Sequence, residues 1–173
     1  MKKKIGIIAL LLLVISVAFL GCGDPAEDKV TLVDIITEQG ISLKLPNDLV
    51  INEGNYDSYV NKETGENVTF GSSEVDSYPI ALWNEEDVLS LYQSRYENVI
   101  LKSFENGKKI NGKEALVAVL DIVTPNNQNI TLTLVLVTDG AYDYIISYIH
   151  GRDNTEGTLA KNIEASIESI RIN

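Results

Sequence analysis

The hydrophobic pattern divides the chain into one unbroken apolar run at its start and shorter alternating segments afterwards. Three lysines at 2–4 precede the apolar run 5–20, which only one glycine and one serine interrupt, and Gly21 and Cys22 follow it. A basic start, an apolar centre and a small residue before the cleavage point are typical of a secretory signal peptide. As a helix this run would be about 24 Å long, shorter than the roughly 30 Å hydrocarbon core of a bilayer. We therefore expect residues 1–21 to be a cleaved leader.

The one cysteine of the chain falls where this leader ends. Phe19-Leu20-Gly21-Cys22 resembles the lipobox of bacterial lipoproteins, although Phe19 stands where leucine is most common. The resemblance implies cleavage before Cys22, diacylglycerol on its sulfur, and anchoring at the extracytoplasmic face of the cell membrane. Residues 22–29 would then be the lipidated cysteine and a short tether. An ordinary secretory signal with an incidental cysteine and an uncleaved anchor are the alternatives.

Residues 30–173 have no second linker or internal repeat, and we expect a single domain there. Period-two alternation and turn residues indicate strands, whereas spacings of three and four indicate helices. The predicted strands are 30–36, 41–45, 67–70, 100–104, 114–123, 130–137 and 141–149. The predicted helices run from an N-cap at Asn84 to about residue 98 and over 155–169.

The last strands and the last helix carry most of the fold prediction. Both alternating sets of residues in 114–123 are apolar, which suits a strand that is covered on both faces. The three runs over 114–149 are consecutive and joined by turns, so they predict an antiparallel meander. Leu159, Ile163, Ile167 and Ile170 share one face of the final helix. These patterns predict an α+β fold in which an antiparallel sheet is sandwiched between helices.

Three segments of this region resemble the PsbP-like family, which includes DcrB-like and LpqN-like bacterial lipoproteins. They are GISLKLP after the first strand, NGKEALVAVLDI at a turn and strand, and LAKNIEASIESIRI at the end. The resemblance covers residues 30–173 and implies an α/β/α sandwich. The family includes a plant photosystem II subunit and a nuclear-import factor that binds a small GTPase. It implies a scaffold that binds other proteins, with no shared catalytic residues.

The net charge of the chain limits the classes of partner that it can bind. The 173 residues include 14 Lys+Arg and 25 Asp+Glu, for a net charge of −11. Removal of the three lysines in 1–21 leaves 11 against 25, or −14. Such a domain is a poor ligand for nucleic-acid phosphates, and anionic lipid would repel it, so acyl chains would have to supply the anchoring.

The sequence offers little for catalysis or metal binding, and we expect neither an enzyme nor a bound cofactor. His150 is the only histidine, no GxSxG motif accompanies it, and one histidine cannot build a zinc site. Calcium is the metal that the acidic composition allows, at Glu74 and Asp76 or at the acids 85–87. The spaced EF-hand pattern is missing, however, and a solvated loop and a helix N-terminus explain the same residues.

Tyrosine is the residue type that could mark a binding surface. Tyr142, Tyr144 and Tyr148 share one face of the last predicted strand. Tyrosine suits surfaces that are both apolar and hydrogen-bonding, so this face is our predicted interaction surface. The alternative is that a helix covers the face and the rings belong to the core.

These observations predict a non-catalytic, lipid-anchored extracytoplasmic module that binds a protein of the cell envelope. Its sheet face or the polar region 52–83 would make the contact. The alternative is a lipoprotein that binds a small ligand or a metal for a transporter or sensor, in a pocket between a helix and the tyrosine-bearing sheet.

Overall fold

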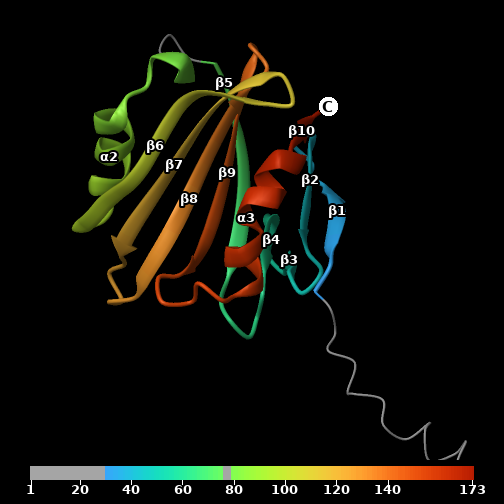
Figure 1. Cartoon of the computed structure of the whole chain (residues 1–173), viewed down its shortest axis with the longest axis vertical. Helices are drawn as coiled ribbons and strands as arrows, with labels where there is room; N and C mark the ends of the chain where they lie inside the picture. The colour runs from blue at the N-terminus through green and yellow to red at the C-terminus, as the bar shows by residue number, and fades with distance from the viewer. Residues whose placement is uncertain (1–29, 76–78) are drawn as a thin grey trace, which may run out of the picture.

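Antiparallel pairing organises the larger of two sheets. The computed structural model describes residues 30–75 and 79–173. Seven strands lie in the order β3-β4-β5-β9-β8-β7-β6, and each neighbouring pair is antiparallel (Figure 1). They are β3 (Val50–Asn52), β4 (Asn55–Val60), β5 (Asn67–Glu74), β6 (Asn98–Ile110), β7 (Lys113–Val123), β8 (Asn129–Thr138) and β9 (Tyr142–Gly151). The predicted antiparallel meander is therefore confirmed, as the run β6 to β9.

A smaller sheet and the helices cover the two faces of this sheet. The smaller sheet has the order β1-β2-β10. Its strands are β1 (Leu32–Ile36), β2 (Ile41–Pro46) and β10 (Arg171–Ile172), and the helices are α2 (Glu85–Gln93), α3 (Thr158–Ser169) and the short 3-10 helix η1 (Ile80–Leu82). Figure 1 shows α2 against one part of the larger sheet, and α3 with the smaller sheet on the other side.

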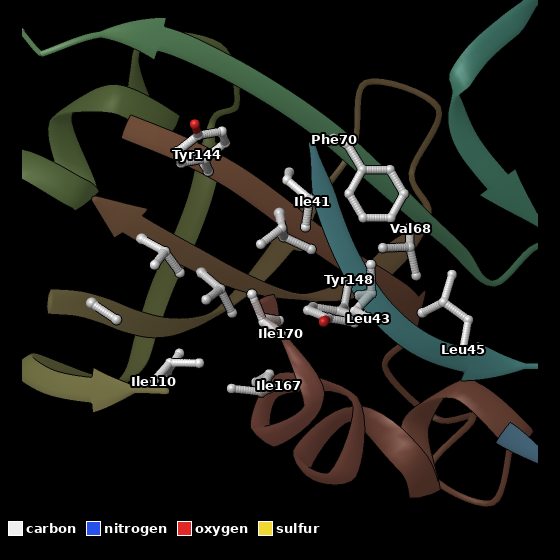
Figure 2. Close-up of a cluster of buried hydrophobic side chains, with 14 of the residues drawn as sticks. Ile41, Leu43, Leu45, Val68, Phe70, Ile110, Tyr144, Tyr148, Ile167 and Ile170 are labelled. Atoms are coloured by element: carbon white, nitrogen blue, oxygen red, sulfur yellow. The ribbon is translucent and has the colours of Figure 1, made fainter. Parts of the chain in front are cut away.

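The core on the α3 side joins the two sheets. Ile41, Leu43 and Leu45 alternate along β2 and are almost fully buried, because period-two alternation points them all toward the larger sheet. Figure 2 shows them facing Tyr148 of β9, with Ile167 of α3 beside the same cluster. Each fully buried large apolar side chain contributes about 1.5–3 kcal/mol. The smaller sheet is therefore held to the larger one by its apolar face.

The core on the α2 side is built on one face of β7, from every second residue of that strand. Leu116, Leu120 and Ile122 are fully buried and pack with Val88 of α2 and Ile80 of η1. On the other face of β7, Ala115 is buried and Val117 is half-buried against the core on the α3 side, whereas the residues that follow on that face are only half-buried. The prediction that both faces of 114–123 are covered therefore holds only for the first part of the strand. The coarse fold is confirmed as α+β and antiparallel.

The sandwich prediction holds only in part. Helix α2 covers one face, but on the other face a three-stranded sheet shares the layer with α3. Sequence analysis assigned 30–36 and 41–45 correctly as strands, but it did not place them in a separate sheet. The short strands β3, β4 and β10 had no predicted counterparts.

The start of α2 is as predicted, whereas its end is not. Asn84 accepts hydrogen bonds from the backbone N–H groups of Glu86 and Asp87, and Asp87 Oδ2 accepts from the N–H of Asn84 at 2.8 Å. This capping box confirms the predicted N-terminus. The helix ends at Gln93 instead of continuing to about residue 98, where β6 already begins.

Strand β6 is much longer than predicted. It continues to Ile110, beyond residue 104 where the predicted strand ends, and only Asn111 and Gly112 form the connection to β7. Both have positive φ, 48° and 83°. Such a pair matches the twist of the flanking strands and closes a two-residue hairpin.

Candidate functional site

The three tyrosines of β9 do not form one surface. Tyr148 is fully buried, and its hydroxyl shares a 3.0 Å hydrogen bond with Ser166 of α3. Burial raises the pKa of the Tyr148 phenol. Tyr144 is 7% exposed and donates to Asp139 Oδ2 at 3.0 Å, whereas Tyr142 is 43% exposed. The predicted surface is therefore wrong for Tyr144 and Tyr148, because α3 and the smaller sheet cover this face, and only Tyr142 remains accessible.

Buried polar side chains gather instead at the N-terminus of α3. The carboxylate of Glu66 is fully buried and accepts from the hydroxyl of Thr64 at 3.1 Å and from the backbone N–H of Ala160 at 3.4 Å. Thr158 donates its hydroxyl proton to Asp48 Oδ2 at 2.6 Å, and Asn61 Nδ2 donates to the same oxygen at 3.0 Å. Acidic groups stabilise the positive end of a helix. Glu66 therefore acts as the cap of a helix that it precedes by about ninety positions.

A polar hollow lies at the same end of the larger sheet. It has a volume of about 670 Å³, and the ends of β5, β8 and β9 line it together with the β7–β8 and β9–α3 loops. Four side-chain amides belong to its lining, those of Asn67, Gln128, Asn129 and Asn154. The hollow was not predicted from the sequence because its residues come from three separate stretches, within 64–67, 124–130 and 149–154.

His150 and Arg152 also line this polar hollow. His150 is 8% exposed and donates from Nδ1 to the carbonyl oxygen of Gly151 at 2.8 Å. Arg152 Nε lies 3.5 Å from Asp121 Oδ2, and Asp121 Oδ1 accepts from the hydroxyl of Thr131 at 2.9 Å. Lys102 Nζ lies 3.9 Å from the same Asp121 oxygen, so this carboxylate is shared between Arg152 and Lys102.

This geometry does not assemble a nucleophile with a base. Thr131 lies directly opposite His150 in the β8–β9 pairing, but its hydroxyl donates to Asp121. A general base must instead accept the hydrogen bond that the hydroxyl it activates donates. The hydroxyl next to His150 is therefore not placed as its nucleophile.

The acidic residues considered for calcium are separated in the structure. Asp87 belongs to the capping box of α2, Glu74 is exposed at the end of β5, and Asp76 lies outside the described residues. Within residues 30–75 and 79–173, no group of three or more His, Cys, Asp or Glu side chains is placed to hold a metal ion.

A second hollow runs between α2 and the free edge of β6. It has a volume of about 500 Å³. Glu85, Leu89 and Gln93 form one wall, at spacings of four along the helix, and residues 99–104 of β6 form the other. We call this hollow the edge groove. The helix spacing of four places its wall residues in a single row parallel to the strand.

Strand β6 is the edge strand along this groove. Its one neighbour in the sheet is β7, and no described residue pairs with its other side. An edge strand presents a row of backbone N–H and C=O groups that a further strand can use. Ile100 is 58% exposed on one face of β6, while Leu101 and Phe104 are half-buried on the face toward α2. The edge groove therefore combines free backbone groups with apolar contacts.

Cys22 and the leader lie outside the described residues. Among the residues that the structure describes, no helix has the length and apolar character to cross a membrane.

No protein-family model matches the chain, and no curated protein matches its sequence. The solution structure of cyanobacterial PsbP (CyanoP) from Synechocystis sp. PCC 6803 is similar, with a TM-score of 0.60 and 13% identity over 87% of this chain and 98% of that chain. The crystal structure of PA94, a protein of unknown function from Pseudomonas aeruginosa, has a TM-score of 0.53 and 12% identity over 82% and 97% of the two chains. At identities this low, structural similarity shows a shared fold but does not show a shared function. The chain has a PsbP-like fold.

Proposed function

We propose that this protein is a non-catalytic lipoprotein, anchored through Cys22 at the extracytoplasmic face of the cell membrane, that binds a protein of the envelope. The leader, the lipobox-like segment and the PsbP-like fold support this assignment. The anchoring has its own test. Cys22→Ser should prevent incorporation of labelled fatty acid and move the protein from the membrane fraction to the soluble fraction. Acylation of the variant, or its retention in the membrane, would contradict lipid anchoring.

The edge groove is the observation that carries the binding function. We propose that an extended segment of the partner adds to β6 as a further strand, with alternate side chains against α2. Strand addition supplies main-chain hydrogen bonds, and the groove wall supplies selectivity. The segment would place apolar side chains beside Leu89, Leu101 and Phe104, where half-buried apolar surface is available.

Features of β6 restrict this edge to a matching partner. Lys102 and Lys109 are exposed, and register shifts occur between Leu101 and Ser103 and between Asn106 and Lys108. Lysines and bulges on an edge strand oppose indiscriminate pairing. A second copy of this chain is a poor occupant, because each processed copy would carry a net charge of −14. The partner segment should instead be neutral or acidic beside Lys102.

Photo-cross-linking in intact cells of the host tests this proposal. A photoreactive residue replaces Ser103 at the groove, and in a separate variant it replaces Tyr142, which is exposed elsewhere. We expect a discrete adduct from position 103 that Leu89→Arg abolishes. Leu91→Arg, on the same helix but outside the groove, should retain it. Mass spectrometry then identifies the cross-linked segment.

A synthetic peptide of that segment should shift the backbone amide resonances of β6 and α2 in a titration. Equal adducts from positions 103 and 142, an adduct that persists in Leu89→Arg, or peptide-induced shifts confined to other elements would each contradict strand addition.

We favour protein binding over the alternative of a ligand pocket between a helix and the tyrosine-bearing sheet. Tyr148, Ile146 and Leu159 fill that region as core. A small ligand would have to bind elsewhere on the molecule.

A further inference from the structure

From the geometry of the polar hollow we infer a second binding site, for a neutral saccharide. The site lies beside the sheet ends and loops around His150 and is separate from the edge groove. Its volume of about 670 Å³ falls within the roughly 300–1,000 Å³ usual for small-molecule sites. This inference is independent of the proposed protein partner.

The first argument is the chemistry of the lining. Gln128, Asn129 and Asn154 each present an amide that can both donate and accept, and none of these side chains bonds to another described residue. A sugar hydroxyl likewise both donates and accepts. Unused amides around an open hollow therefore suit a ligand that carries many hydroxyl groups.

The second argument is charge. Asp121 faces two cations, Arg152 at 3.5 Å and Lys102 at 3.9 Å, and Asp153 adds an exposed carboxylate to the lining, so these charges at and beside the hollow sum to zero. An anionic ligand would meet a cation that is already paired and a carboxylate of its own sign. A cationic ligand would find one carboxylate and the competing guanidinium. A neutral ligand avoids both costs.

The third argument is the apolar part of the lining. Ile130 and Ile149 are half-buried and line the polar hollow together with the amides. The C–H faces of a sugar ring are apolar, so these two side chains offer contact area that a purely polar ion would not use. Amides with an apolar patch thus favour a saccharide over phosphate or a carboxylic acid.

Ligand-observed NMR titrations of the full-length protein in detergent test the site. The probes are chitotriose and maltotriose, with inorganic phosphate and citrate as anionic probes. We expect saturable binding of at least one trisaccharide and none of either anion. The double variant Gln128→Ala/Asn129→Ala should weaken that binding about tenfold or more, since each lost hydrogen bond reduces affinity several-fold.

Asn126→Ala is the matched control, because it removes an exposed amide from the same loop that does not line the hollow and should leave saccharide affinity unchanged. Unfolding curves of the double variant establish that it remains folded, as expected for two exposed side chains in a turn and strand end. Failure of both trisaccharides to bind, preferential binding of phosphate or citrate, or equal affinity in the double variant would overturn the inference. Each of these results leaves the test of strand addition unaffected.

Discussion

The carboxylate of Glu66 occupies the space that a β-carbon at Gly157 would need. Gly157 is the N-cap of α3, and it contributes no side-chain cap of its own. Glu66 is the last residue of the connection between β4 and β5. Its carboxylate accepts a hydrogen bond from the backbone N–H of Ala160 in the first turn of the helix. The helix therefore receives its N-terminal cap from a residue distant in sequence, and the glycine is required for the close approach.

Gly157→Ala should destabilise the fold by about 1–3 kcal/mol, because an added methyl group must displace the buried carboxylate. Urea denaturation of the variant measures the free energy of unfolding. Gly71→Ala is the matched control, since a β-carbon there would meet no atom within 4 Å. It should leave stability unchanged or raise it by up to about 1 kcal/mol. Equal stability of the two variants would contradict this role for Gly157.

Asn111 should stabilise the opposite end of α3. Its Nδ2 donates to the carbonyl oxygens of Glu168 at 3.0 Å and of Ile170 at 2.6 Å. Asn111→Gly keeps a residue that tolerates φ of 48° but loses both hydrogen bonds, so we expect a loss of about 1–2 kcal/mol in urea unfolding. Asn111→Ala should cost about 1 kcal/mol more, because alanine is strained at positive φ.

Asn127 provides the control for this prediction. It also has positive φ, 58°, but its side chain bonds to no other described residue. Asn127→Gly should therefore be nearly neutral. A loss as large as that of Asn111→Gly would show that backbone conformation, and not the contact with α3, sets the effect.

Patterns that depend on neighbouring residues were predicted well from the sequence. The capping box at Asn84 and the apolar face of α3 are local signals, and both are present. The double-sided burial predicted for 114–123 is present only in part. The end of α2 was misplaced because Tyr96 and Val99 continue a helical spacing of apolar residues. In the structure they pack on the same core from a loop and from β6.

The candidate sites depend on contacts that no local pattern encodes. Glu66 lies in a polar stretch and is a residue type usually found on the surface, yet it is fully buried because α3 begins against it. The polar hollow joins three stretches of the chain, and the edge groove exists because β6 is last in the sheet order. The sequence does contain one local signal for the groove. The apolar residues within 99–104 follow a predicted helix that has charged residues at 85–87 at its start and at 95 and 97 near its end.

Asp139 should make stability depend on acid pH. The backbone N–H groups of Tyr142 and Ala141, followed by the hydroxyl of Tyr144, hold the pKa of its carboxyl below the ordinary 3.8. A carboxyl whose pKa is lowered by folding stabilises the fold above its unfolded pKa, and this contribution is lost as pH falls through the folded pKa. The stability difference between wild type and Asp139→Asn should thus be constant above about pH 5 and shrink below about pH 4. Urea unfolding at a series of pH values measures it, and a difference that stays constant down to pH 3 would refute the assignment.

Tyr148 should make the protein less stable as pH rises in the alkaline range, whereas Asp139 makes it less stable as pH falls in the acid range. Burial raises the pKa of its phenol, and the hydrogen bond to Ser166 offsets only part of that rise. The unfolded chain, in which the phenol has a pKa of about 10, then loses its proton more readily than the folded chain does. Unfolding therefore becomes easier as pH rises above about 10, whereas below that pH the contribution is fully present.

Guanidinium unfolding of wild type and Tyr148→Phe between pH 7 and pH 11 separates this effect from other titrations. At pH 7 the variant should be less stable by about 1–2 kcal/mol, because the buried hydroxyl of Ser166 loses its partner. Above pH 10 its stability should decline less steeply than that of the wild type, by up to about 1.4 kcal/mol per pH unit. Tyr148→Phe/Ser166→Ala removes the unpaired hydroxyl and should recover part of the loss at pH 7 while keeping the shallower decline. If the free energy of unfolding declined equally steeply above pH 10 in all three proteins, Tyr148 would have to ionise inside the folded core between α3 and the sheet. That result would contradict the prediction, because the phenol is completely buried.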